Sequence, residues 1–282
     1  MGVIFALLSA VFYALVFFFA KLLVTKARKP LVVAALFQLL AGLLAIPLFL
    51  LEPARVNQTQ DIWTLLVIVI VLYSFFNVFN FISNKLLDFS ITGILSQSTL
   101  IITFLGSLMV FGEPATLNKI IAVILILLAN ISILIKKKSG AKINFKGIVI
   151  RLAASIILGS ALIIDAKNSV NFSLPLYAFI TYFFPGILTY IFSRANFSDV
   201  REHIARFYKG IFLMSLMGTL GYYFLIKSFQ TLEKSIAAPL NNLSPVIMVC
   251  LGIVFLKETD RIWVKIFAVI IVFLAAVLLN LA

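Results

Sequence analysis

The chain has 282 residues, of which 63% are hydrophobic and only 12% charged, and its mean hydropathy is +1.18. A soluble domain is nearer to about 45–50% apolar and about 25% charged, so this composition excludes a water-soluble globular protein. A hydrocarbon core about 30 Å thick is crossed by roughly 20 helical residues. Ten such crossings use most of the chain and leave no room for a sizeable extramembrane domain.

Apolar stretches separated by charged or turn residues predict ten membrane-spanning helices, and the first is read as a retained helix rather than a signal peptide. They run over residues 2–24, 31–51, 62–84, 91–111, 117–135, 147–166, 175–193, 208–229, 235–256 and 261–281. The expected fold is therefore an all-α membrane protein with ten transmembrane helices.

The two halves of the chain resemble each other when the sequence is shifted by 145 positions, so that Glu113 falls on Glu258 and Asp88 on Glu233. A basic stretch lies at the centre. We therefore expect a first five-helix repeat over residues 1–138, a linker over 139–146 and a second five-helix repeat over 147–282. Because five is odd, the second repeat starts on the far side of the membrane and is inverted, an architecture that recurs in secondary transporters.

The distribution of basic residues predicts an orientation. The odd-numbered connections and the span ends beside them hold 18 of the 23 lysines and arginines, so the positive-inside rule places these connections in the cytoplasm and both termini outside. The net charge of +13 is explained by this orientation and by contact with anionic membrane lipids, and no nucleic-acid partner is expected.

Few residues are available for catalysis or for metal binding. The single cysteine, Cys250, excludes disulfides and thiolate clusters, and the single histidine, His203, is expected in a polar loop. Most acidic residues fall at the ends of spans. We expect no enzyme activity, no metal site and no cofactor.

Two short motifs resemble each other at the ends of the fourth and ninth spans. They read Phe-Gly-Glu-Pro at 111–114 and Leu-Lys-Glu-Thr at 256–259, and Lys21 lies near the end of the first span. With the length and the duplication, these features resemble the ten-helix EamA type of the drug/metabolite transporter superfamily. The resemblance implies export or uptake of small metabolites, often amino acids, through a cavity lined by helices 1, 3, 4, 6, 8 and 9. It also implies cytoplasmic termini, opposite to the charge count, and glycines where this chain has Ala122 and Ala268.

Polar residues recur at matching depth in the two halves, although uncompensated polar side chains are costly in a bilayer. The 145-residue shift carries Ser96, Gln97 and Thr99 of the fourth span onto polar residues of the ninth. The predicted substrate-binding residues are Tyr13, Asn77, Asn80, Ser96, Gln97, Thr99, Tyr222, Tyr223, Asn241, Asn242 and Ser244. Hydrogen bonding between helices is the alternative role for each of them.

Four charged residues are candidates for contact with the charges of a ligand. Lys21, Arg151 and Lys227 either extend to the membrane interface or hold a substrate carboxylate or phosphate. Asp165, near the end of the sixth span, is the candidate for protonation. Pro245 is expected to kink the ninth helix just after Asn242.

Together these observations predict a multi-pass secondary transporter of a prokaryotic cytoplasmic (inner) membrane. Its substrate is a small polar or amphipathic metabolite, an amino acid or derivative, with export favoured, moved by alternating access and coupled to protons or sodium. A nucleotide-sugar or sugar-phosphate exchanger is the alternative within transport, and a membrane-embedded enzyme is the alternative from another class. The sequence does not define an oligomeric state.

Overall fold

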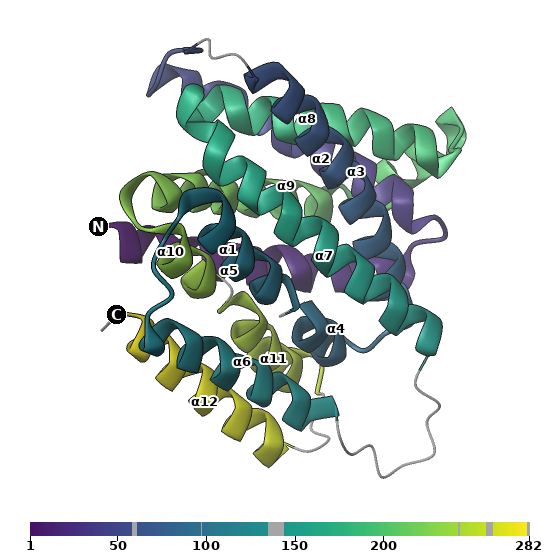
Figure 1. Cartoon of the computed structure of the whole chain (residues 1–282). Coiled ribbons are helices and arrows are strands. Elements are labelled where there is room, and N and C mark those ends of the chain that lie inside the picture. The colour runs from purple at the N-terminus through teal and green to yellow at the C-terminus, as the bar shows by residue number, and fades with distance from the viewer. Residues whose placement is uncertain (58–60, 97, 135–143, 242, 258–261, 281–282) are drawn as a thin grey trace.

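The computed structural model describes residues 1–57, 61–96, 98–134, 144–241, 243–257 and 262–280, and these are almost entirely helical (Figure 1). The first half contains α1 (Gly2–Lys26), α2 (Pro30–Ala45), η1 (Ile46–Leu50), α3 (Ile62–Leu86), α4 (Phe89–Ser96), α5 (Ser98–Phe111) and α6 (Leu117–Leu134). The second half contains α7 (Phe145–Asn168), η2 (Ser169–Asn171), α8 (Leu174–Ser193), α9 (Phe197–Thr231), α10 (Lys234–Asn241), α11 (Ser244–Phe255) and α12 (Ile262–Asn280).

Seven of the described segments are long and apolar enough to cross a membrane, and three shorter apolar helices complete the set. The fourth span consists of α4 and α5, and the ninth consists of α10 and α11. No strand occurs among the residues described above, although Val56 and Phe172 form one isolated antiparallel bridge. The predicted all-α membrane fold is confirmed, and ten helices in two repeats fit it.

The two halves run in opposite directions. In Figure 1, α1 begins at the left, where both termini are marked, whereas α7 runs from right to left. The first helix of each half packs within the other half: α1 contacts α9, α10 and α11, and α7 contacts α3, α4 and α5. Equivalent helices of the two halves also pack on each other, α2 with α8 and α6 with α12. In addition, α2 contacts α9, and α8 contacts α3 in the same way.

Small residues allow these helices to approach closely. Ala6, Ala10 and Ala14 follow one another at four-residue intervals along α1, and all three are fully buried. On the same helix, the Ser9 hydroxyl donates a hydrogen bond of 2.7 Å to the Gly221 carbonyl of α9. Close contact and hydrogen bonds of this kind hold membrane helices together where lipid provides no hydrophobic drive.

The alanines that stand where the family resemblance implies glycine lie in the contact between α6 and α12. Ala122 and Ala129 of α6 cluster with Ala268 and Ala275 of α12, and all four are buried. Their spacing of seven residues puts each pair on one face of its helix. At these four positions, α6 of the first repeat therefore packs against α12 of the second through alanine methyl groups.

The eighth span is longer than predicted, and the expected position of His203 in a loop is wrong. Instead of starting at residue 208, α9 begins at Phe197, after a capping box in which Asn196 and Asp199 bond each other's backbone amides. His203 lies buried in this helix, where its Nε2 atom accepts a hydrogen bond of 3.4 Å from the Lys29 amide. Thirty-five residues extend roughly 50 Å, so α9 is longer than a bilayer core is thick.

The ninth span is interrupted near the predicted position. Rather than one kinked helix, it forms α10, which ends at Asn241, and α11, which begins at Ser244 after a turn at Leu243. Pro245 stands in the first turn of α11, where the missing amide hydrogen costs no helical hydrogen bond. The proline therefore starts a new helix. Asn242 itself lies outside the described residues.

Candidate functional site

A cavity of about 80 Å³ lies between the two halves of the molecule. Among the described residues, every α-helix except α6 and α12 contributes to its wall. The lining residues are Tyr13, Val16, Phe17, Ala20, Phe37, Gln38, Tyr73, Phe76, Asn77, Asn80, Phe81, Ser96, Thr99, Arg151, Leu158, Leu162, Thr181, Tyr182, Tyr222, Leu225, Asn241 and Ser244. Such an apolar and aromatic wall with a few polar groups is typical of a small-molecule site.

Most of the predicted substrate-binding residues meet in this cavity. The eight that line it are Tyr13, Asn77, Asn80, Ser96, Thr99, Tyr222, Asn241 and Ser244. Gln97 and Asn242 lie outside the described residues. Tyr223 is half-buried and absent from the wall, and its ring contacts that of Phe224 at 5.8 Å.

The structure also brings two helices to the cavity that the family resemblance does not include. Gln38 of α2, which is the second span, and Tyr182 of α8, which is the seventh span, both line it. The two helices pack closely at Gly186, where a glycine leaves room for the neighbouring backbone. A Cβ atom added there would lie only 2.9 Å from the Leu39 backbone nitrogen. A single glutamine in the otherwise apolar α2 was the available sequence signal for this contribution.

Several of the polar residues bond to helix backbones, which is the alternative role considered for them. The Asn77 amide donates to the Tyr73 carbonyl at 2.8 Å, and the Thr99 hydroxyl donates to the Ser155 carbonyl at 3.2 Å. Ser96 likewise donates to the Gly93 carbonyl. These three side chains therefore face the cavity while also stabilising the helices around it.

Three polar atoms in the cavity wall are buried and have no hydrogen-bond partner among the described residues. They are Nε of Arg151, Nε2 of Gln38 and Oδ1 of Asn241. The other amide atom of Gln38, Oε1, accepts a hydrogen bond of 2.8 Å from Thr189. Leaving buried polar groups unpaired is costly, so these atoms provide two donors and one acceptor for a bound molecule.

Arg151 is the only charged residue among the described residues that line the cavity, and it is 1% exposed. Its Nη1 atom donates to Oδ1 of Asn80, and its guanidinium carbon lies 5.9 Å from the centre of the Phe17 ring. No carboxylate forms an ion pair with it in the described part of the chain. A buried guanidinium is costly inside a membrane protein, so Arg151 is a candidate for contact with a ligand.

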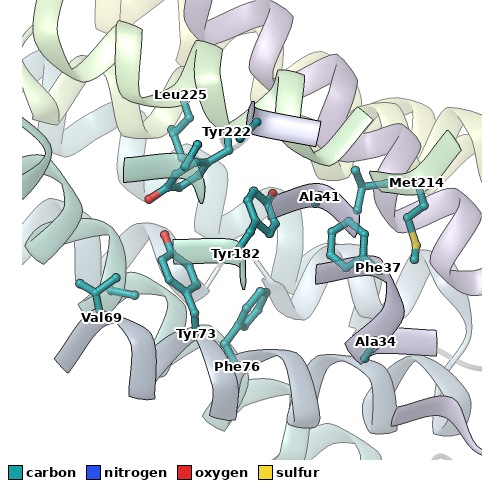
Figure 2. Packing of buried hydrophobic residues seen from close by; sticks show 14 of the residues in the cluster. Ala34, Phe37, Ala41, Val69, Tyr73, Phe76, Tyr182, Met214, Tyr222 and Leu225 are labelled. Atoms are coloured by element: carbon teal, nitrogen blue, oxygen red, sulfur yellow. The ribbon is translucent and has the colours of Figure 1, made fainter. Parts of the chain in front are cut away.

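A cluster of tyrosines surrounds the Asp165 carboxylate beside the cavity. Tyr73 and Tyr222 both donate their hydroxyl hydrogens to Oδ2, and Tyr177 donates to Oδ1. Figure 2 shows the hydroxyls of Tyr73 and Tyr222 turned toward each other, with Tyr182 nearby. Asp165 itself is fully buried. The sequence identified Asp165, and also Tyr222 as a cavity residue, but it did not indicate that three phenols hold the carboxylate.

The other two candidate charges do not reach the cavity. Lys21 donates through Nζ to the carbonyls of Asn84 and Leu87, at 3.0 and 2.7 Å. These carbonyls belong to the end of α3, where an ammonium group satisfies free acceptors and the helix dipole. Lys227 is half-buried on α9 and absent from the wall. Neither lysine is placed to hold a ligand there.

Among the described residues, no three histidine, cysteine, aspartate or glutamate side chains are grouped to hold a metal ion. The described wall of the cavity offers a small molecule one guanidinium, several amides and hydroxyls, and aromatic surface.

Comparisons with known proteins agree with the two-repeat helical fold. The sequence model of the EamA-like transporter family matches residues 1–135 and, a second time, residues 145–281. A protein of known crystal structure is similar to this chain with a TM-score of 0.71 at 16% identity, over 97% of this chain and 96% of that one. No curated protein matches the sequence. The chain is a membrane protein of the EamA-like transporter family, within the drug/metabolite transporter superfamily.

Proposed function

We propose that this transporter moves a small amphipathic carboxylate, an amino acid or a derivative of one, and that export is its direction. The cavity between the inverted halves is the proposed binding site, and transport occurs by alternating access. Inverted repeats support this mechanism because two similar halves can adopt two similar packings, one open to each side of the membrane.

The observation that carries the proposal is Arg151, which is buried in the wall and whose Nε atom has no partner in the part of the chain that the structure describes. A guanidinium presents a planar fork of donors that matches a carboxylate. Asn80 already accepts from Nη1 and so holds the fork in place. A substrate carboxylate would supply both the missing charge and the missing acceptor.

The rest of the wall suits the remainder of an amino acid. Oδ1 of Asn241 is an unpaired acceptor for a substrate ammonium group. Phe17, Phe37 and Phe76 provide aromatic surface for an apolar side chain. Phosphorylated substrates would need more positive charge than one guanidinium, so the described wall favours a monoanionic carboxylate over a sugar phosphate.

Counterflow in liposomes tests this proposal. Purified protein is reconstituted, and exchange of radiolabelled amino acids is compared with exchange of their amides, sugar phosphates and nucleotide sugars. Wild-type protein should exchange acids and reject the amides. Arg151→Gln should weaken acid binding roughly ten- to a hundredfold, since a charged hydrogen bond contributes about 1.5–3 kcal/mol.

The control is Arg201→Gln, which removes the same charge from an exposed position on α9 and should leave exchange unchanged. Equal exchange of acids and amides, or full activity in Arg151→Gln, would contradict the proposed site. Exchange of sugar phosphates without exchange of amino acids would contradict the proposed substrate and would support the sugar-phosphate exchanger instead. Export is tested separately by preloading vesicles in which the protein has a known orientation.

A further inference from the structure

Asp165 is a fully buried carboxylate held by both halves of the molecule. Its tyrosine donors come from α3 in the first half and from α8 and α9 in the second. No lysine, arginine or histidine forms an ion pair with it in the described residues. The cavity does not include Asp165 in its wall, but it does include Tyr73 and Tyr222.

We propose that Asp165 is the site at which this transporter binds and releases its coupling proton. This inference rests on the transport function proposed above, and it assigns a separate residue to the driving ion. Buried aspartates in membrane spans commonly form proton relays because the charged form is costly there unless it is hydrogen-bonded.

The position of Asp165 excludes it as the partner of the substrate ammonium group. Asp165 and Arg151 are on the same face of α7 and are separated by 14 positions, which is roughly 21 Å along the helix axis. An α-amino acid joins its ammonium and carboxylate through a single carbon. One substrate molecule therefore cannot contact both residues.

The hydrogen bonds favour a proton over a metal cation. Tyr177 and Tyr222 each donate at 2.8 Å, so their hydroxyl hydrogens already occupy the space next to the carboxylate oxygens. A sodium ion needs several oxygen lone pairs directed at it, whereas here the phenols direct hydrogens toward Asp165. A proton needs only one carboxylate lone pair.

Protonation would change the contact between the two halves. The ionised carboxylate accepts all three phenols. When a proton from water binds Oδ2, that oxygen becomes a donor, and either Tyr73 or Tyr222 must turn its hydroxyl hydrogen away. Release of the same proton restores the three bonds. Because Tyr73 belongs to one half and Tyr222 to the other, this step alters a contact between repeats.

Among the described residues, the titratable groups next to Asp165 are phenols, which come from α1, α3, α8 and α9. Besides the three donors, Tyr13 of α1 and Tyr182 of α8 lie close to the carboxylate. The nearest basic residue on its own helix, Lys167, is exposed. Tyr13 and Tyr182 line the cavity, as do Tyr73 and Tyr222, so phenols lie between the carboxylate and the proposed substrate site.

The test separates exchange, which needs no net proton movement, from accumulation driven by a pH gradient. In liposomes, Asp165→Asn should keep counterflow near the wild-type rate. Accumulation of substrate against its gradient should fall to the level of empty liposomes, and substrate-dependent proton flux, followed with a pH-sensitive dye, should disappear. Asp165→Glu should restore part of both.

Asp199→Asn is the matched control, because Asp199 pairs with Lys29 at the start of α9, outside the tyrosine cluster. Gradient-driven accumulation that persists in Asp165→Asn would overturn the proposal, as would accumulation in wild type that follows sodium instead of pH. Loss of counterflow together with accumulation in Asp165→Asn, without rescue by glutamate, would show a structural role and also overturn it. Failure of the substrate proposal is recognised separately, as absence of counterflow in the wild type.

Discussion

Gly147, at the start of α7, packs directly against Leu87 at the end of α3: a Cβ atom added at the glycine would lie 2.9 Å from Cδ2 of the leucine. The shift of 145 residues relates Gly2 to Gly147 and Leu87 to Leu232, and the second pair is also in contact. A Cβ atom added at Gly2 would lie 2.5 Å from Cγ of Leu232. Each glycine lies in the first turn of the first helix of its half, and each leucine belongs to the other half. The inverted repeat thus places equivalent contacts at opposite ends of the molecule.

A larger side chain at one of these glycines should prevent the two halves from closing against each other at that end of the molecule only. Gly147→Val and Gly2→Val should both slow counterflow strongly while leaving substrate binding at equilibrium intact, because the cavity residues are untouched. The measurements are counterflow in liposomes and substrate binding in detergent.

A size exchange provides the control for this prediction. Adding Leu87→Ala to Gly147→Val restores the space at the contact, so the double variant should recover most of the lost rate. Loss of binding in the single variants would show that the glycines stabilise the fold rather than limit its opening.

Asn80 offers a second test of the anion site, because it is the hydrogen-bond partner of Arg151. Asn80→Asp places a carboxylate of the protein where the proposed substrate carboxylate would compete. Thermal stability in detergent should be maintained or increased, and substrate affinity should fall about tenfold or more, equivalent to about 1.4 kcal/mol. Unchanged affinity in a stable Asn80→Asp protein would argue against a substrate contact at Arg151.

The predicted repeat extends to backbone conformation. Gly112, with φ of 64°, and Lys257, with φ of 55°, are related by the same shift of 145 residues, and both are left-handed. Because this conformation is unfavourable for residues with a Cβ atom, Gly112→Ala should destabilise the protein by about 1 kcal/mol. Lys257→Gly should be neutral or stabilising. Thermal unfolding in detergent measures both, and equal losses in the two variants would contradict the assignment.

The two halves are also joined by an ion pair with one buried partner. Lys119 of α6 donates to Oε2 of Glu233 at 2.7 Å, and the lysine side chain is 2% exposed while the glutamate is 53% exposed. Glu233→Gln leaves the buried ammonium without its counter-charge, which should cost roughly 1–2 kcal/mol. Asp199→Asn should cost less, because the lysine that it leaves without a counter-charge, Lys29, is 38% exposed and therefore solvated. Unfolding midpoints compared across both variants test this ranking.

Much of the fold could be predicted because composition and hydropathy determine which residues cross a membrane. The duplicated polar pattern also indicated the inverted repeat. The extension of α9 was missed because Arg201, His203 and Arg206 break the apolar pattern, although these residues are helical. Asn196 and Asp199 are spaced as a capping box and could have indicated the earlier start.

The site was predicted in part, because polarity at matched depth shows which residues can face a cavity but not how neighbouring helices are rotated. Asn80 and Asn241 were identified from such polarity, and they line the cavity. Tyr177 and Tyr182 were missed because an isolated tyrosine in an apolar helix gives no sign of its direction. Their contacts depend on the close packing of α8 against α2.

The most direct test of the account is whether the cavity opens to both sides of the membrane. Ser244 lines the cavity, so Ser244→Cys in a Cys250→Ser background gives a single thiol for a membrane-impermeant maleimide. Alternating access predicts labelling from either side in vesicles of opposite orientation, and protection by a transported amino acid from both. Labelling from one side alone under all gradients, or labelling that substrate never reduces, would contradict it.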